Sequence, residues 1–318
     1  MHSIKSAIGL TVTYFSWSLC AVFIAASEFG VASVLLQAFA TFLIFLAYTK
    51  HKGIKLNFKE AISSLPYSLA RVATLCLSVY AYLHLDVGVV STIGACSVFV
   101  LAGIIAPLNG EKFKKQLILP IVSSIVGVAL VSGVFNTSGF GDFNVYYLFA
   151  LGYMIAASLS SFLWRKSVLR ISSTKHIIYM HGWTTLLTIP VLSIFIYSHA
   201  ISSDITPTLI QVLLLVASSL VGTFGDFVFS YAQKFSSDTM NGIFIPLVAL
   251  FSCLLGWILL NETLLLSQIV GVTIVILSVG YASVCTKNKN TIGNDLSVPI
   301  DYQKVALLSP IATQKSVV

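Results

Sequence analysis

Long runs of apolar residues, separated by short polar segments, repeat along the first 286 residues of the chain. Each run is about 20 residues long, the length that an α-helix needs to cross the hydrocarbon core of a bilayer. The runs are continuously apolar rather than alternating, so they predict helices and not the strands of a membrane barrel. The ten predicted spans are Ala7–Ala26, Val31–Tyr48, Leu65–Leu85, Val87–Leu108, Gln116–Phe135, Val145–Trp164, Ile177–Tyr197, Thr208–Phe229, Asn241–Leu260 and Leu264–Val284.

The basic residues between these runs predict the orientation of the helices. With ten spans, every one of the 18 Lys and Arg residues except Arg71 falls on the side where the chain begins. Positive charge collects on the cytoplasmic side of membrane proteins. We therefore predict a multi-pass protein with both termini in the cytoplasm, and a bacterial inner membrane as its location.

The composition excludes a soluble domain and a nucleic-acid binder. Hydrophobic residues make up 57% of the chain and charged residues 9%, with a mean hydropathy of +0.94, whereas soluble domains devote about a quarter of their residues to charge. The net charge of +7 is distributed over loops and not over a basic face. The five cysteines lie in or beside apolar runs without metal-ligand spacing, so neither a metal nor another cofactor is predicted. The polar segment 287–318 is expected to be a disordered cytoplasmic tail.

A short sequence signal occurs twice, five helices apart. Residues 108–111 read Leu-Asn-Gly-Glu after the fourth span, and residues 260–262 read Leu-Asn-Glu after the ninth. This indicates an internal duplication. We interpret Glu111 and Glu262 as structural residues whose carboxylates complement the N-terminus of the helix that follows.

The duplication predicts two halves of five helices each, residues 1–135 and 136–286. Because five is an odd number, the second half must thread the membrane in the opposite direction. The loop charges agree, since loops that correspond in the two halves carry Lys and Arg in one half and none in the other. The predicted fold class is therefore an all-α integral membrane protein built as two inverted repeats, a construction common in secondary transporters.

With these features the chain resembles the EamA type of the drug/metabolite transporter superfamily. The resemblance rests on the ten-helix plan, the Gly110–Glu111 turn, the Gln268–Gly271 segment after Glu262, and Pro246 ahead of it. It assigns structural roles to Pro246 and Gly271. It also implies that the first, third, fourth, sixth, eighth and ninth spans enclose a substrate cavity.

Arg71 and Asp226 are the two ionised residues that fall well inside predicted spans, where each costs roughly 2.5–3.5 kcal/mol to insert. Both are expected at the same depth on the cytoplasmic side and on stripes of polar or small residues that face the bundle interior. One interpretation is a fixed ion pair that locks two helices, or an arginine that reaches the interface. The other is a site in which Arg71 holds an anionic group of a substrate and Asp226 holds an amine, a proton or, in one conformation, Arg71 itself.

Other polar positions complete the predicted site. The stripe of Arg71 adds Tyr67, Thr74 and Ser78, and the implied cavity walls add Tyr14, Trp17 and Asn241. Gly222 and Gly225 are expected to loosen the helix around Asp226. His84 and His181 lie near predicted span ends and are interpreted as ordinary solvated side chains.

The function predicted from these features is secondary transport of a small polar metabolite, preferably anionic or zwitterionic and amino-acid-like. The expected partners are this substrate, a proton or counter-substrate, membrane lipid and, as an open option, a second copy in a homodimer. Two alternatives remain: an exporter of lipophilic cations, and a receptor or scaffold that acts through its C-terminal tail. No nucleophile, metal or paired-carboxylate motif was found, so we do not predict an enzyme.

Overall fold

In a computed structural model of the chain, residues 2–27, 31–85, 90, 93–111, 114–131, 145–197, 208–260 and 265–287 are described, and these residues contain helices and turns without strands. The elements are α1 (His2–Ser27), α2 (Val31–His51), α3 (Phe58–His84), the π-helical segment η1 (Phe99–Ile105), α5 (Ala106–Leu108), the 3-10 turn η2 (Lys115–Leu117), α6 (Ile118–Val131), α7 (Tyr146–Val168), α8 (Ser173–Tyr197), α9 (Leu209–Ala232), α10 (Asp238–Phe244), α11 (Leu247–Leu260) and α12 (Leu266–Lys287). The predicted all-helical class is confirmed.

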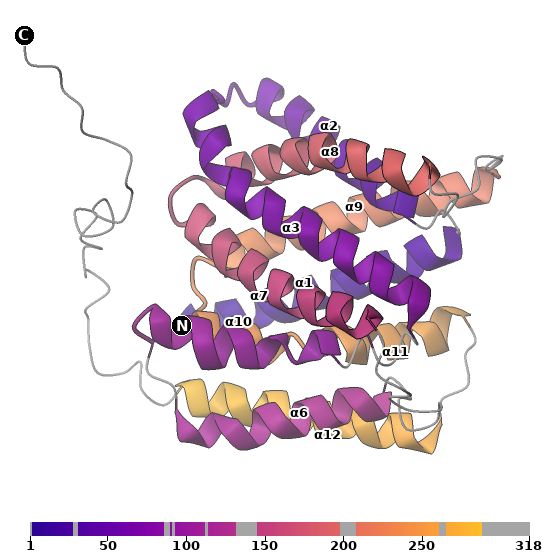
Figure 1. The fold of residues 1–318 in the computed structure, drawn as a ribbon. Coiled ribbons are helices and arrows are strands. Elements are labelled where there is room, and N and C mark those ends of the chain that lie inside the picture. The colour runs from indigo at the N-terminus through magenta and orange to yellow at the C-terminus, as the bar shows by residue number, and fades with distance from the viewer. Residues whose placement is uncertain are drawn as a thin grey trace, which may run out of the picture.

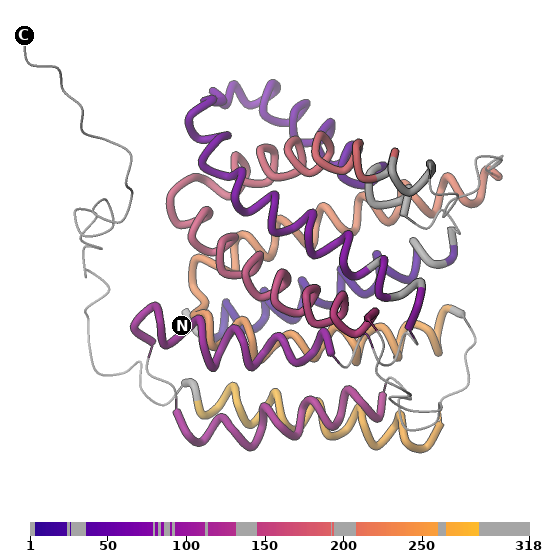
Figure 2. The backbone as a smooth tube through the Cα atoms, viewed as in Figure 1, coloured from indigo at the N-terminus to yellow at the C-terminus, as the bar shows by residue number. Residues whose placement is uncertain are grey.

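The helices form one bundle in which segments distant in sequence lie side by side (Figures 1 and 2). The most extensive contacts join α1 with α9, α3 with α7, α6 with α12, and α2 with α8. The pair α2 and α8 forms one side of the bundle, and the pair α6 and α12 forms the opposite side (Figure 1). Every one of these pairs joins the first half of the chain to the second, so neither half is packed mainly on itself.

The exposure pattern is that of a protein surrounded by lipid. On α9, Leu213 and Leu220 are more than half exposed, whereas Ser218 and Ser219 are buried. Within the part of the chain that the structure describes, five helical segments are long and apolar enough to cross a membrane: Ile4–Phe23, Tyr146–Val168, Leu209–Ala232, Asp238–Leu259 and Leu266–Cys285. Apolar side chains outside and hydroxyl groups inside are favourable only when the surrounding solvent is itself apolar.

Helix α3 begins seven residues before the predicted span, so Arg71 lies farther from the start of its helix than expected. The span was expected to begin at Leu65, but α3 begins at Phe58, where Asn57 caps it by accepting a hydrogen bond from the Lys59 amide. Arg71 thus lies about 20 Å along the helix from Phe58, at 1.5 Å per residue. The polar first turns of α3 were excluded by the hydropathy pattern although their backbone is helical.

Two residues predicted to be structural have clear packing roles. Pro246 lies between the end of α10 and the start of α11, so it interrupts the predicted ninth span. A side chain at Gly271 would come within 2.6 Å of the Gly127 carbonyl oxygen and 2.8 Å of Leu130 Cβ, so Gly271 permits the close approach of α6 and α12. Glu262 and the predicted tail after Lys287 lie outside the described residues.

The Asn-Gly-Glu signal at residues 109–111 is a helix C-cap. Gly110 has a φ of 82°, and the amides of Gly110 and Glu111 donate to the carbonyls of Pro107 and Ala106. This left-handed conformation is accessible to glycine at little cost, which explains why glycine precedes the glutamate.

Candidate functional site

Arg71 of α3 and Asp226 of α9 meet inside the bundle. Arg71 Nη2 lies 3.4 Å from Asp226 Oδ2, and the second guanidinium nitrogen, Nη1, donates to the Tyr67 hydroxyl at 3.2 Å. The Asp226 side chain is 1% exposed, whereas that of Arg71 is 20% exposed. The pair expected from the depth of the two charges is therefore present, with the Asp226 carboxylate fully enclosed and the Arg71 side chain partly exposed.

Two further side chains donate to Asp226. Trp17 Nε1 of α1 lies 3.0 Å from Oδ1, and His181 Nε2 of α8 lies 2.8 Å from Oδ2. A carboxylate only accepts hydrogen bonds, so in each pair the ring nitrogen is the donor. The carboxylate thus joins four helices, α1, α3, α8 and α9. We call Trp17, Tyr67, Arg71, His181 and Asp226 the central cluster.

The interpretation of His181 as a solvated side chain was wrong. His181 is 1% exposed, because α8 begins at Ser173 and places it two turns inside the helix. A sequence signal was available: His181, Thr184, Thr185 and Thr188 follow helical spacing and are all buried. Such a polar stripe indicates an interior face rather than a span end.

Aromatic rings enclose the central cluster. Trp164 of α7 lies beneath the Arg71 guanidinium, with 5.5 Å between Cζ and the ring centroid. The Trp17 ring packs 4.9 Å from Phe229 and 5.6 Å from Tyr14, and Trp164 packs 5.1 Å from Tyr67. Sequence reasoning missed Trp164, which precedes the interfacial Arg165 and Lys166 and therefore resembled an interfacial anchor.

Gly222 and Gly225 let neighbouring helices approach Asp226. A Cβ at Gly225 would come within 2.9 Å of Trp17 Cδ1, and one at Gly222 within 2.1 Å of Gln37 Nε2. The expectation that these glycines loosen the helix is wrong, since α9 is continuous from Leu209 to Ala232. Their role in the structure is steric.

The other predicted site residues divide into two groups. Tyr14 donates to Asn241 Oδ1 at 3.1 Å and contacts Trp17, so these three residues connect α10 to the central cluster. Thr74 and Ser78 instead donate to carbonyls of their own helix, those of Ala70 and Leu75. The structure therefore places Thr74 and Ser78 on the helix without bringing them to Asp226.

A second polar cluster lies at the end of the bundle where α1 begins and α12 ends, which we call the basic end. Glu111 accepts hydrogen bonds from the Asp238 amide at 2.8 Å, and from the Thr239 amide and hydroxyl at 3.1 and 2.8 Å. Arg165 of α7 contacts Glu111 at 3.2 Å and Asp238 at 3.0 Å. The carboxylate does complement a helix N-terminus, but that of α10, which is remote in sequence.

The central cluster holds unused hydrogen-bonding capacity. Arg71 has five N–H donors, and its buried Nε has no partner among the described residues. The single 3.4 Å contact with Asp226 is longer and less specific than a bidentate guanidinium–carboxylate pair. No group of three or more His, Cys, Asp or Glu residues that would suit a metal ion occurs in the described part of the chain.

Comparisons with known proteins agree with this architecture. Residues 144–284 match the family model described as "EamA-like transporter family". No curated protein matches the chain. A solved structure described only as "Crystal structure of protein" has a similar fold, with a TM-score of 0.72 and 14% identity over 91% of this chain and 99% of that chain. The match over residues 144–284 supports the resemblance of this segment to the EamA type of drug/metabolite transporters.

Proposed function

We propose that this protein is a secondary transporter that carries a small anionic or zwitterionic metabolite across a membrane by alternating access. Arg71 is the residue that receives the negative group of the substrate, and Asp226 is its resident partner when the site is empty. The observation that carries the proposal is the asymmetry of the pair, in which the Asp226 side chain is 1% exposed and the Arg71 side chain is 20% exposed, while the buried Arg71 Nε has no partner among the described residues.

The hydrogen bonds of Asp226 support an exchange of partners. When Arg71 turns to a substrate carboxylate, Asp226 still accepts from Trp17 and His181, so its charge is not left without donors. Arg71 in turn gains a ligand that can accept two parallel hydrogen bonds. A zwitterionic substrate would also place its amine beside Asp226, which is why we retain the amino-acid-like class.

The helix contacts support the two inverted repeats. Numbering the ten predicted spans in order, the four most extensive contacts join spans 1 and 8, 3 and 6, 5 and 10, and 2 and 7, and a smaller contact through η1 and α10 joins spans 4 and 9. If each span is replaced by its counterpart in the other half, five places away, the pair 1 and 8 becomes the pair 6 and 3. The pairs 2 and 7, 4 and 9, and 5 and 10 each become themselves. That is the pattern of a twofold relation between the halves, and it lets the halves rock about a site between them.

The basic end supplies a closing contact for such a cycle. Glu111, Arg165 and Asp238 tie the end of α5 to α7 and α10 there. We place this end in the cytoplasm because the basic residues gather on it. Opening to that side would require these charge-assisted contacts to separate, while the central cluster stays at the pivot.

Export of lipophilic cations is the second candidate, and one observation favours it. Tyr14, Trp17, Trp164 and Phe229 form an aromatic wall beside an acidic residue, and such walls bind organic cations. Arg71 lies over the same aromatic surface at present. A cation would have to displace it, so we rank this function second.

The test is ligand-dependent melting of the purified full-length protein with amino acids, nucleotides, sugar phosphates, organic acids and tetraphenylphosphonium, beside Arg71→Ala. A ligand that binds the folded state raises the melting temperature by mass action. A rise with an anionic or zwitterionic compound that disappears in Arg71→Ala supports the proposal. A rise with tetraphenylphosphonium that persists in the variant would overturn it in favour of the second candidate.

A further inference from the structure

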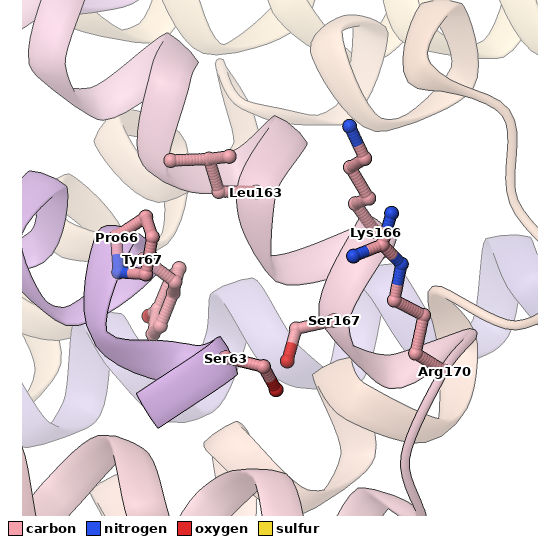
Figure 3. Close-up of a pocket in the computed structure, with 7 residues that line it drawn as sticks. All are labelled: Ser63, Pro66, Tyr67, Leu163, Lys166, Ser167 and Arg170. Atoms are coloured by element: carbon pink, nitrogen blue, oxygen red, sulfur yellow. The ribbon is translucent and has the colours of Figure 1, made fainter. Parts of the chain in front are cut away.

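A pocket at the basic end, which shares only Tyr67 with the central cluster, has its own chemistry (Figure 3). It has a volume of about 160 Å³ and lies between α3 and α7. Helix α3 contributes Ser63, Pro66 and Tyr67, and α7 contributes Leu163, Lys166, Ser167 and Arg170. Both sets follow helical spacing, so each forms one stripe, and the two stripes face each other.

The pocket carries excess positive charge. Lys166 and Arg170 are exposed, and neither forms an ion pair with a residue that the structure describes. The third cation of this helix end, Arg165, is paired with Glu111 and Asp238. The C-terminus of α7 contributes only about half a negative charge, so it does not neutralise these two cations.

The nearest acidic residue in the same part of α3 does not neutralise them. Glu60 lies one turn before Ser63, in the polar segment that precedes the predicted span. Its carboxylate accepts from Lys175 at 2.9 Å and from the Tyr179 hydroxyl at 3.1 Å. The hydrogen bond from Lys175 holds the pKa of Glu60 below its usual range, so this carboxylate is fully committed to another pair.

Hydroxyl groups complete the lining. Ser63 and Ser167 face each other across the pocket (Figure 3). Ser167 Oγ lies 2.7 Å from His176 Nδ1, and His176 Nε2 is buried without a partner in the described residues. A buried donor without an acceptor is more costly than an idle acceptor, which favours the tautomer with the proton on Nδ1. In that tautomer Ser167 accepts from His176, and its own proton is free to point into the pocket.

Apolar surface adjoins this polar pocket on the side of the predicted membrane. Leu69 of α3 and Leu159 of α7 lie one to two turns away from the pocket in that direction, and they are 50% and 43% exposed. A cluster of two cations and two hydroxyls at the edge of an exposed apolar face matches a phospholipid, whose phosphate lies at the interface and whose chains lie below it.

We propose that this pocket binds the phosphate group of an anionic phospholipid, with Lys166 and Arg170 as its charged ligands and Ser167 as its hydroxyl ligand. The Ser63 hydroxyl lines the pocket but donates to the Glu60 carbonyl at 2.7 Å. The acyl chains lie on the exposed apolar side chains of α3 and α7. The site does not depend on the substrate proposed above, because it shares only Tyr67 with the central cluster and uses none of the donors of Arg71. Tyr67 lines the pocket and also accepts from Arg71, so the lipid contacts the wall of the transport site.

The test uses the full-length protein in nanodiscs of phosphatidylcholine alone or with phosphatidylglycerol. Native mass spectrometry measures retained phosphatidylglycerol, and a melting curve measures the stability that it confers. The variant is Lys166→Gln with Arg170→Gln. At about 1 kcal/mol for each basic residue, retention should fall about thirtyfold. The matched control is Lys50→Gln with Lys52→Gln, which removes two exposed charges from the end of α2.

The outcomes distinguish a specific lipid site from general surface charge and from a site for a soluble phosphate compound. Loss of retained lipid in the pocket variant, with retention in the control and an unchanged melting temperature in phosphatidylcholine, supports the site. Equal loss in both variants would reduce it to general surface charge and overturn the proposal. Equal stabilisation by inorganic phosphate added to phosphatidylcholine nanodiscs would assign the pocket to a soluble phosphate compound, and would overturn the lipid assignment. Arg170→Lys, which keeps the charge, should retain the lipid; if it does not, charge is not what binds it.

Discussion

The variant Arg71→Lys tests whether Arg71 binds the substrate or only supplies a structural positive charge, because lysine keeps the charge but lacks the planar guanidinium. In the structure Arg71 makes one long contact with Asp226 at 3.4 Å and one with Tyr67 at 3.2 Å. A lysine ammonium retains the attraction to Asp226 but cannot donate two parallel hydrogen bonds to one carboxylate. The empty protein should therefore tolerate the change, and the bound complex should not.

The expected loss follows from one missing hydrogen bond. A hydrogen bond to a charged group contributes about 1.5–3 kcal/mol, so the affinity for a carboxylate or phosphate substrate should fall roughly ten- to hundredfold. The melting temperature without ligand should stay close to that of the wild type. Arg71→Ala should abolish binding, while Asp226 keeps its bonds to Trp17 and His181.

The assay is isothermal titration of the purified variants with whichever anionic or zwitterionic compound stabilises the wild type. The control is Asp226→Asn, which leaves the Arg71 charge without its counter-ion inside the bundle. Breaking a buried pair in this way costs up to about 3–5 kcal/mol, somewhat less here because Arg71 is partly exposed. Unchanged affinity in Arg71→Lys would refute the claim that the Arg71 guanidinium binds the substrate through two parallel hydrogen bonds. If Arg71→Ala and Asp226→Asn each fail to fold, and the double variant with the two residues exchanged does fold, the ion pair has a structural role and is not a substrate site.

Substitutions at three further positions, two of them with a matched control, test the structure around the site. His181→Ala removes a buried donor to Asp226 and should lower the free energy of unfolding by about 1–3 kcal/mol, whereas His181→Gln, which can still donate, should lose much less; equal melting temperatures would contradict this. Glu111→Gln removes a charge shared by Arg165 and the α10 amides and should cost about 1–3 kcal/mol by thermal melting, and it should raise cysteine labelling at the basic end. Gly225→Ala forces Trp17 away and should cost about 1–3 kcal/mol and weaken ligand binding. Gly280→Ala, with nothing within 4 Å, should be neutral or slightly stabilising, and a loss there would undermine the steric account.

The helical class and the pair of Arg71 and Asp226 could be predicted from the sequence, because each follows from a large free-energy cost that a short stretch of sequence reveals. About 20 apolar residues in a row have no low-energy place outside lipid or a buried core. An ionised residue inside such a run needs a partner, and Asp226 and Arg71 were the two candidates. Their pairing followed from depth along two helices, which needs only the rise per residue.

The rest of the site could not be predicted because its signals depend on where each helix begins. Hydropathy placed the third span at Leu65 and the seventh at Ile177, whereas the helices begin at Phe58 and Ser173. Polar first turns carry no hydropathy signal, yet they decide whether His181 lies at a span end or two turns inside. Because the seventh span was predicted to begin four residues too late, His181 was not recognised as a hydrogen-bond donor to Asp226.

Glu111 shows a different limit, which concerns partners and not boundaries. The Asn-Gly-Glu signal predicted a carboxylate at a helix end and its attraction to helix amides, but any exposed helix N-terminus satisfies that rule. Its partner is α10, which is more than 120 residues away along the chain and is brought close only when the two halves pack together. If the same carboxylate closes the basic end, as proposed above, the sequence offers Glu262 as its counterpart, and the predicted topology puts residue 262 on the opposite side of the membrane. The repeat then supplies one such residue for each side, and alternating access requires that these two ends never open together.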